Sequence, residues 1–384
     1  MSKTRNQHAD FDAIAIGAGF SGLYMLHRLR EAGFSTQVYE AGKDVGGVWY
    51  WNRYPGARCD SESIYYNYTF SEELYNEWEW SSRFPEQPEI LEYLNFVADR
   101  LDLRKDIEFN TRIQSAQFDE DKNIWRVKKN DGTTVTATYF ITAVGCISTA
   151  NIPKFKGIEN FEGDWYHTGH WPHEKVDFSG KRVGVIGTGS SGVQAIPVIA
   201  EEAGHLTVFQ RTPQYSVPAR NHPFDEEYNN KVKANFKELK KGMRESGGGI
   251  PVEPGPPSAI EDTPENRQKI YERHWKDGGI GFFGAYQDIL VNPESNETAG
   301  EFVRSKIRET VQDPETAKKL SPTYYYATKR PILDTNYYET YNRDNVSLVD
   351  VKNAPIEEIT SKGVRTSTES MNWTLSYSQP DMTA

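Results

Sequence analysis

The sequence predicts an α/β protein with two doubly wound Rossmann-like dinucleotide-binding domains and a helical insertion in the second. One observation is a glycine fingerprint that follows a strand and opens a helix, near the N-terminus. Another is a second copy of the same unit about 170 residues later, and a third is a charged, helical stretch after that copy. At 384 residues the chain has room for two or three domains of ordinary size.

The first unit consists of a strand over residues 12–16, the fingerprint Gly17-x-Gly19-x-x-Gly22, and a helix over residues 23–30. Missing side chains let a pyrophosphate approach the backbone at the start of such a helix. Glu40 follows the next strand, 23 residues after Gly17, where an acid can accept hydrogen bonds from a ribose. A glycine triplet alone often only permits close packing, but strand, helix and acid together predict binding of an ADP moiety.

The second unit repeats this order, with a strand over residues 181–186, the fingerprint Gly187-x-Gly189-x-x-Gly192, a helix through Ala203 and a strand over residues 206–209. Arg211, 24 residues after Gly187, takes the place of the acid. A guanidinium suits a 2′-phosphate, so this unit is predicted to bind NADPH rather than NADH. The alternative is a solvated surface arginine.

Other patterns give the domain limits. Residues 124–138 resemble a hairpin that turns at Asn130, Asp131 and Gly132 and feeds a strand over residues 139–143. Helices are expected over residues 228–244 and 264–275, and strands over 346–350 and 356–360 are expected to resume the second sheet. The predicted parts are a first domain over residues 1–145, a second over 146–223 and 321–368 with the insertion 224–320 between, and a tail over 369–384.

Composition narrows the function classes. A net charge of -11 and a pI near 5.4 argue against a nucleic-acid partner. The sequence shows neither a signal peptide nor an apolar run of membrane-spanning length, so no membrane association is expected. Cys59 and Cys146 form no Cys-x-x-Cys pair, which removes disulfide-reductase chemistry and suits a cytoplasmic location. No metal site is predicted, and the sequence does not indicate the oligomeric state.

Three motifs together resemble those of one enzyme family. They are Phe161-x-Gly163-x-x-x-His167-x-x-x-Trp171-Pro172, a loop matched at Gly47, Trp49, Tyr54, Pro55, Gly56 and Asp60, and Lys329-Arg330-Pro331. The family is that of the Baeyer–Villiger monooxygenases, flavoenzymes that insert one oxygen atom of O2 beside a ketone. Taken singly, the loop could be aromatic packing and Lys329-Arg330-Pro331 a surface turn.

The resemblance implies FAD in the first domain, NADPH in the second, and formation of esters or lactones through a C4a-peroxyflavin. Arg330 and Asp60 are then the catalytic residues: Arg330 stabilises the peroxide and the oxyanion of the adduct, and Asp60 orients Arg330 beside the flavin. The expected FAD residues are Gly17, Gly19, Phe20, Gly22, Glu40, Gly47, Val48, Trp49 and Asp60. The expected NADP residues are Gly187, Thr188, Gly189, Ser190, Ser191, Gly192, Arg211, Thr212 and Lys329.

For His167 and Trp171 we favour a structural role between the domains over proton transfer. The nearest alternative function is that of an N- or S-oxidising flavin monooxygenase. Two motifs, Trp171-Pro172 and Lys329-Arg330-Pro331, favour the ketone-oxidising enzymes over this alternative. A further alternative is an inactive, truncated nucleotide-binding protein.

The resemblance ends near Thr368, whereas family members continue into the flavin domain through a strand that ends Ala-Thr-Gly-(Phe/Tyr)-Asp. Codons for Gln379 to Thr383, read one nucleotide earlier, are compatible with Ala-Thr-Gly-Tyr-Asp. We therefore expect that a frameshift replaced the C-terminal part of the flavin domain.

Overall fold

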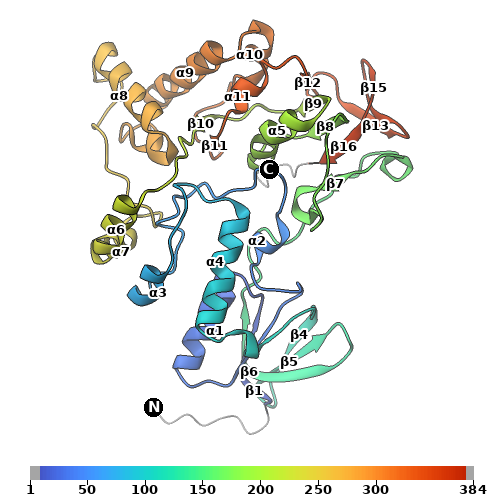
Figure 1. Cartoon of the computed structure of the whole chain (residues 1–384), viewed down its shortest axis with the longest axis vertical. Helices are drawn as coiled ribbons and strands as arrows, with labels where there is room; N and C mark the ends of the chain where they lie inside the picture. Colours follow the sequence, from blue (N-terminus) through green and yellow to red (C-terminus); the bar gives the residue numbers. More distant parts are fainter. Residues whose placement is uncertain (1–8, 378–384) are drawn as a thin grey trace. The chain divides into compact units, whose positions relative to one another are not determined.

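The computed structural model describes residues 9–377, the last four by their backbone alone. Two compact units make up the chain (Figure 1). Unit 1 consists of Met1–Arg53 and Gln87–Ala150, and unit 2 of Tyr54–Glu86 and Asn151–Ala384. The loop motif that runs from Gly47 to Asp60 is thus divided, with its first part in unit 1 and Asp60 in unit 2.

Unit 1 contains a six-stranded sheet of order β3-β2-β1-β6-β5-β4. The strands are β1 Phe11–Ile16, β2 Thr36–Tyr39, β3 Ile107–Glu108, β4 Ile113–Asp119, β5 Ile124–Lys129 and β6 Thr134–Thr142. The four strands β3, β2, β1 and β6 are parallel, and β5 and β4 add an antiparallel ribbon at one edge (Figure 1). A parallel central strand is covered on both faces, which explains why Ala13, Ile14 and Ala15 are fully buried.

The helices of unit 1 are α1 Phe20–Glu31, α2 Val48–Trp51 and α4 Gln87–Arg100, with a 3₁₀ turn η1 at Arg104–Asp106. On α4 the buried side chains Ile90, Tyr93, Leu94 and Val97 recur at helical spacing and form one apolar face. Sequence analysis did not predict this helix.

Unit 2 contains a parallel five-stranded sheet of order β12-β9-β8-β16-β7. Its strands are β7 Tyr166–His167, β8 Arg182–Ile186, β9 His205–Gln210, β12 Val346–Asp350 and β16 Thr374–Tyr377. A two-stranded parallel sheet joins β10 Ser216–Pro218 to β11 Ile332–Asp334, and a separate antiparallel sheet holds β13 Ile356–Thr360, β14 Gly363–Thr366 and β15 Ser370–Asn372.

The helices of unit 2 are α3 Glu72–Glu77, α5 Ser190–Glu202, α6 Glu226–Ala234, α7 Phe236–Glu245, α8 Pro264–Asp277, α9 Pro293–Thr310, α10 Pro314–Leu320 and α11 Tyr337–Thr340. The 3₁₀ turns are η2 Ile158–Asn160, η3 Thr168–His170 and η4 Gly279–Gly284. Helices α8, α9 and α10, orange in Figure 1, belong to the predicted insertion. Their aromatic core includes Tyr271, Phe282 and Phe302, whose rings contact one another.

The predicted fold class is confirmed, and so is the hairpin: β5 pairs antiparallel with β6, although β6 continues as one strand through Thr142. The charged helical stretch predicted over residues 228–244 is confirmed as helical, but it consists of two helices, because Asn235 (φ -101°, ψ 17°) separates α6 from α7. The prediction for residues 346–350 is confirmed, since β12 pairs with β9. The strand over residues 356–360 exists but belongs to the small antiparallel sheet and does not resume the parallel one.

The predicted tail, residues 369–384, contains β15 and β16 within the described residues. Residues 378–384 lie outside them, including Gln379 to Thr383, on which the reading-frame hypothesis depends. That hypothesis and the predicted domain limits remain predictions.

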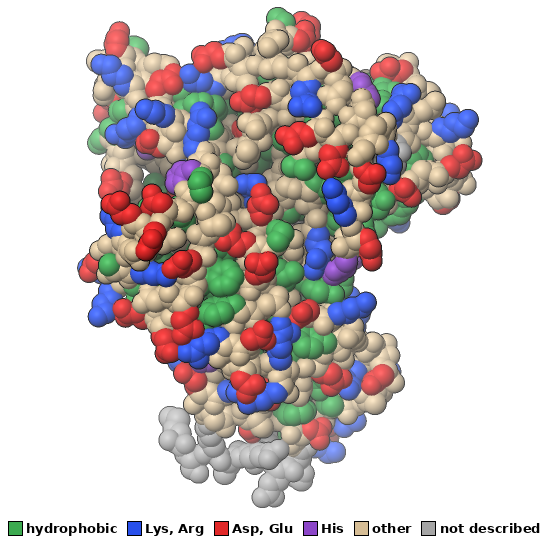
Figure 2. All heavy atoms as spheres, viewed as in Figure 1, with side chains coloured by type: hydrophobic (Ala, Val, Ile, Leu, Met, Phe, Trp, Pro, Cys, Tyr) green, Lys and Arg blue, Asp and Glu red, His purple; other side chains and the backbone are tan. Residues whose placement is uncertain are grey.

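Acidic and basic side chains are interspersed on the face of the molecule that Figure 2 shows. Among the described residues, no helix combines the length and the apolar character that crossing a membrane requires. The same residues contain no cluster of three or more His, Cys, Asp or Glu side chains suited to a metal ion.

Candidate functional site

The first fingerprint turns tightly between β1 and α1. Gly17 has a φ of +102°, and its N–H donates to the carbonyl of Tyr39 at 2.8 Å, which ties the turn to the end of β2. A Cβ at Gly22 would lie 1.8 Å from the carbonyl oxygen of Gly17. A side chain at either position would collide with backbone atoms, which cannot move aside as a flexible side chain could.

The N-terminus of α1 is left open by the same residues. Its N-cap is Gly19, with no side-chain cap, and Phe20 is its first residue. A Cβ on Gly47 would approach the Cα of Gly19 to 2.8 Å, so the backbone before α2 passes directly against the fingerprint. Val48 begins α2, and the carbonyl of Trp49 accepts a hydrogen bond from Gln87 Nε2 at 2.5 Å.

Glu40 is only 5% exposed, and its carboxylate binds backbone on both sides. Oε2 accepts the N–H of Ala18 and Oε1 accepts the N–H of Gly42, each at 2.7 Å. Because an ionised carboxylate offers about four acceptor positions, two such bonds leave capacity for hydroxyl donors. The acid is thus fixed beside the fingerprint, directly after β2, which is where an acid that binds a ribose is expected in this fold.

The second fingerprint repeats this backbone in unit 2. Gly187 has a φ of +100°, and its N–H donates to Phe209 at 2.9 Å. Gly189 is the N-cap of α5 and provides no side-chain cap. Thr188 is buried and its hydroxyl donates to the carbonyl of Thr212 at 3.3 Å. The first turn of α5 contains Ser190, Ser191 and the buried Gly192.

Arg211 directly follows β9 and is exposed. Over residues 9–373, where side chains are described, its guanidinium has neither an ion pair nor a hydrogen bond. An unpaired cation beside a fingerprint can bind a phosphate without first losing a protein partner.

The helix N-termini provide a test of whether these residues fit dinucleotides. Side chains cap the first turns of α3, α6, α8, α9 and α10, through Ser71, Asp225, Thr263, Asn292 and Asp313. Helices α1 and α5 instead begin at uncapped glycines; α2, α7 and α11 also lack a side-chain cap, but of these only the four-residue α2 begins at a glycine. Free N–H groups at a glycine-lined helix start bind pyrophosphate well, so both fingerprints fit a dinucleotide.

Asp60 and Arg330, 270 residues apart, form an ion pair in unit 2 with Oδ2 and Nη2 separated by 2.5 Å. The Arg330 side chain is 65% exposed, and that of Asp60 is 25% exposed. Pro331 and then strand β11 directly follow Arg330. The backbone after Arg330 is therefore extended and pairs with β10 in a two-stranded sheet. Neighbouring Lys329 places its Nζ 5.5 Å from the centre of the Tyr324 ring.

The segment that carries Asp60 is fixed to α5 by Gln194, a residue that sequence analysis missed. Gln194 Oε1 accepts the hydroxyl of Tyr54 at 2.8 Å, and Gln194 Nε2 donates to the carbonyl of Arg58 at 3.1 Å. A Cβ on Gly56 would lie 2.4 Å from the backbone oxygen of Gln194. A polar residue between the apolar Val193 and Ile196 of α5 was the available signal.

Two other motif residues lie in this unit. His167 is buried, and its Nδ1 accepts the N–H of Gly169 at 3.1 Å; burial, and then repulsion from His170, lower its pKa. Trp171 is buried against Tyr166 and Phe178. A neutral, bonded histidine and a packed tryptophan agree with the structural role that we favour.

The structure therefore groups the candidate residues in three places. In unit 1 the fingerprint, Glu40 and the Gly47 backbone come together. Unit 2 contains the second fingerprint with Thr212 and Arg211, and the pair Asp60–Arg330 with Lys329 beside it in the chain.

Comparison with known proteins agrees with this arrangement. Residues 12–236 match the flavin-binding monooxygenase-like family. The chain is 48% identical, over 94% of its length, to a Baeyer–Villiger monooxygenase of Pseudooceanicola batsensis, and 48% identical, also over 94%, to a phenazine N-monooxygenase of Lysobacter antibioticus. It spans 67% of the length of each.

A solved structure, the complex of OTEMO with FAD and NADP, is similar to 97% of this chain, which covers 72% of that one, with a TM-score of 0.94 and 40% identity. The chain thus belongs to the Baeyer–Villiger monooxygenases, within the flavin-binding monooxygenase-like family.

Proposed function

We propose that the protein is an FAD- and NADPH-dependent enzyme that converts ketones into esters or lactones. One ketone, O2, NADPH and a proton yield one ester, NADP⁺ and water. The observation that carries this proposal is the Asp60–Arg330 ion pair. It lies in a chain with two dinucleotide fingerprints, one followed by the acidic Glu40 and the other by the basic Arg211. Similarity to a named Baeyer–Villiger monooxygenase supports it.

FAD would bind unit 1. The open N-terminus of α1 would hold its pyrophosphate, and Glu40 would accept a ribose hydroxyl. The other residues of unit 1 that we assign to FAD are Gly17, Gly19, Phe20, Gly22, Gly47, Val48 and Trp49. Asp60, which belongs to unit 2, is assigned to FAD from the motif resemblance alone. The close approach of Gly47 to Gly19 supports the assignment of Gly47 to FAD, because only backbone atoms, and no side chain of residue 47, lie beside the fingerprint.

NADPH would bind unit 2. Residues 187–192 would hold its pyrophosphate, and Arg211 its 2′-phosphate. Thr212 is linked to Thr188 by a hydrogen bond, and the ammonium of Lys329 would supply a further phosphate contact. The NADP of the similar OTEMO complex supports this choice of nucleotide.

When bound, flavin and NADPH supply the hydride transfer and the O2 chemistry. The chain's own contribution is electrostatic. Arg330 provides a fixed positive charge for the oxyanion that forms when a ketone carbonyl is attacked, and such stabilisation is worth roughly 3–4 kcal/mol. Asp60 orients the guanidinium through the ion pair and balances its charge.

Replacement of Arg330 tests the proposal. In Arg330→Ala we expect NADPH still to reduce the flavin, while ester formation from a cyclic ketone falls at least about 100-fold. Stopped-flow reduction and product chromatography measure the two steps, and Arg343→Ala is the control because Arg343 is also exposed. Unchanged ester yield in Arg330→Ala would remove the proposed role.

The phenazine N-monooxygenase relative favours one second candidate, oxidation of a nitrogen atom. Product analysis with a cyclic ketone, an amine and a sulfide separates the two. Ester formation supports our proposal, whereas an N-oxide or S-oxide without ester supports the alternative. A colourless protein that oxidises no NADPH would indicate an inactive nucleotide-binding chain.

We also propose a cytoplasmic protein that has no nucleic-acid partner. The free thiols of Cys59 and Cys146 and the net charge of -11 support this.

A further inference from the structure

The backbone that leads to Arg330 has little regular structure of its own. Between α10 and β11, residues 321–331 form turns and bends without a helix or a strand. Ala327 adopts a φ of +65°, which is unfavourable for a residue with a side chain. Such a segment requires other parts of the molecule to bind its N–H and C=O groups.

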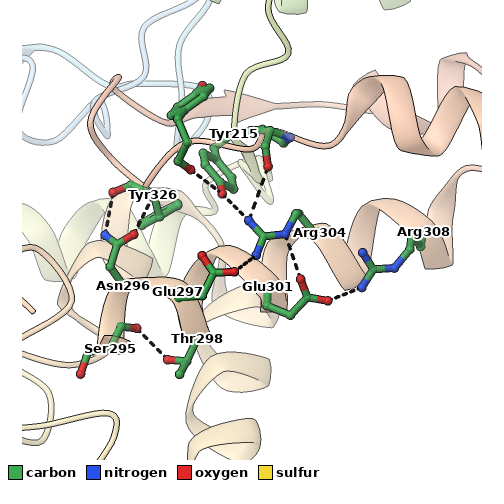
Figure 3. Close-up of polar contacts among 11 residues, drawn as sticks. Tyr215, Ser295, Asn296, Glu297, Thr298, Glu301, Arg304, Arg308 and Tyr326 are labelled. Carbon is green, nitrogen blue, oxygen red and sulfur yellow. Dashed lines mark hydrogen bonds and ion pairs between the residues drawn. The ribbon is translucent and has the colours of Figure 1, made fainter. Parts of the chain in front are cut away.

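Asn296 of α9 binds this segment at Tyr326 (Figure 3). Its Oδ1 accepts the N–H of Tyr326 at 2.8 Å, and its Nδ2 donates to the carbonyl of Tyr326 at 2.9 Å. The same Nδ2 donates to the carbonyl of Ile289 at 2.9 Å. Asn296 is 7% exposed, so it binds both polar groups of one residue as a neighbouring strand would.

Arg304, two turns later on α9, supports the segment at a second point. Its Nη1 donates to the hydroxyl of Tyr215 at 2.9 Å, and that hydroxyl donates to the carbonyl of Tyr324 at 3.0 Å. Glu297 and Glu301 pair with the guanidinium and fix its position (Figure 3). On the other side of Arg330, pairing of β11 with β10 fixes the chain.

We propose that Asn296 is a positioning residue for Lys329 and Arg330. Tyr326 lies four residues before Arg330, and the strained Ala327 lies between them. Without the amide of Asn296, two backbone groups of Tyr326 lose their partner, and Ala327 is released from its unfavourable conformation. The consequence for catalysis depends on the proposed function: Arg330 would no longer be held where charge develops, and reduced oxygen would leave as hydrogen peroxide.

The test compares Asn296→Ala with Ser295→Ala. Ser295 is the adjacent residue on α9 and is fully buried, but its hydroxyl donates to Asp288 Oδ2 at 2.6 Å. Hydrogen exchange measured by mass spectrometry should be at least about tenfold faster over residues 326–330 in Asn296→Ala. Ser295→Ala should leave exchange there within about twofold of the original protein, even if its melting temperature falls.

Activity gives the second readout. In Asn296→Ala the hydrogen peroxide formed per NADPH oxidised should rise and the ester fall, while Ser295→Ala keeps the original ratio. If Asn296→Ala does not fold, Asn296→Asp replaces it, because a carboxylate still accepts the N–H of Tyr326 but donates to neither carbonyl.

Equal exchange in the Asn296 and Ser295 variants would overturn the proposal, as would faster exchange spread evenly over α8, α9 and α10. Faster local exchange with an unchanged product ratio would also overturn it. If the original protein forms no ester, the proposed function fails, and the exchange data still decide whether Asn296 fixes the segment.

Discussion

The two fingerprints have nearly the same backbone and opposite electrostatics. Gly17 and Gly187 share a φ near +100°, and each donates to the end of the next strand, at 2.8 and 2.9 Å. After that strand, unit 1 has a buried Glu40 that binds two backbone N–H groups, and unit 2 has an exposed Arg211 whose guanidinium makes no hydrogen bond within the described part of the chain.

The difference separates two kinds of requirement. Glycines serve the geometry of the turn and are needed by both units. Glu40 is part of the fold, because its carboxylate accepts the N–H groups of Ala18 and Gly42, and we propose that it also binds the ligand. Arg211 is exposed, and the role that we propose for it is recognition of the nucleotide alone. Variants at these positions should therefore affect stability and binding in different proportions.

Gly22→Ala should have the largest effect. The new Cβ would lie 1.8 Å from a backbone oxygen, which cannot move without opening the turn. We expect a loss of about 4 kcal/mol in unfolding free energy and loss of flavin on purification. Denaturant titration and the flavin absorbance measure both, with Gly248→Ala as control because a Cβ there meets nothing within 4 Å. Normal flavin content in Gly22→Ala would show that the turn adapts.

Glu40→Ala should have the next largest effect, on stability and FAD binding together. Two buried N–H groups would lose their acceptor, at a cost of about 2–4 kcal/mol. Glu40→Gln retains the shape and one acceptor, so about half that loss is expected. Denaturation of the apoprotein and FAD titration give the two values. A change in affinity with no change in stability would place Glu40 in the same class as Arg211.

Arg211→Ala should have the smallest effect on the fold, within about 0.5 kcal/mol. Preference for NADPH over NADH should fall about 10- to 100-fold, since a charge-assisted contact to the 2′-phosphate is lost. Steady-state kinetics with both nucleotides measure it, and Lys269→Ala, an exposed cation on α8, is the control. Unchanged discrimination would make Arg211 an ordinary surface residue.

Local patterns predicted the parts of the fold that are local. Strand, glycine turn and helix are adjacent in sequence, so both fingerprints and the hairpin at residues 130–132 were found with correct limits to within a few residues. Helix α4 was missed although its apolar spacing is helical. Sheet membership of residues 356–360 was not predictable, because it depends on antiparallel partners later in the chain.

The candidate site divides in the same way. Motif resemblance suggested that Asp60 acts with Arg330, and the structure brings them within 2.5 Å. Gln194 and Asn296 were missed because each binds backbone atoms of a residue that is distant in sequence. Every residue except proline has the same backbone groups, so a sequence motif cannot indicate which of them a side chain binds. Roles of individual site residues remain predictions.

Cys59, next to Asp60, has a further consequence for durability. Burial raises the pKa of its thiol to about 12. The thiolate is the form that oxidants and alkylating agents attack, so the Cys59 thiol should react slowly with both. Thiol reagents should label the exposed Cys146 first, and under the proposed function a slowly oxidised Cys59 would keep the segment next to Asp60 intact during turnover.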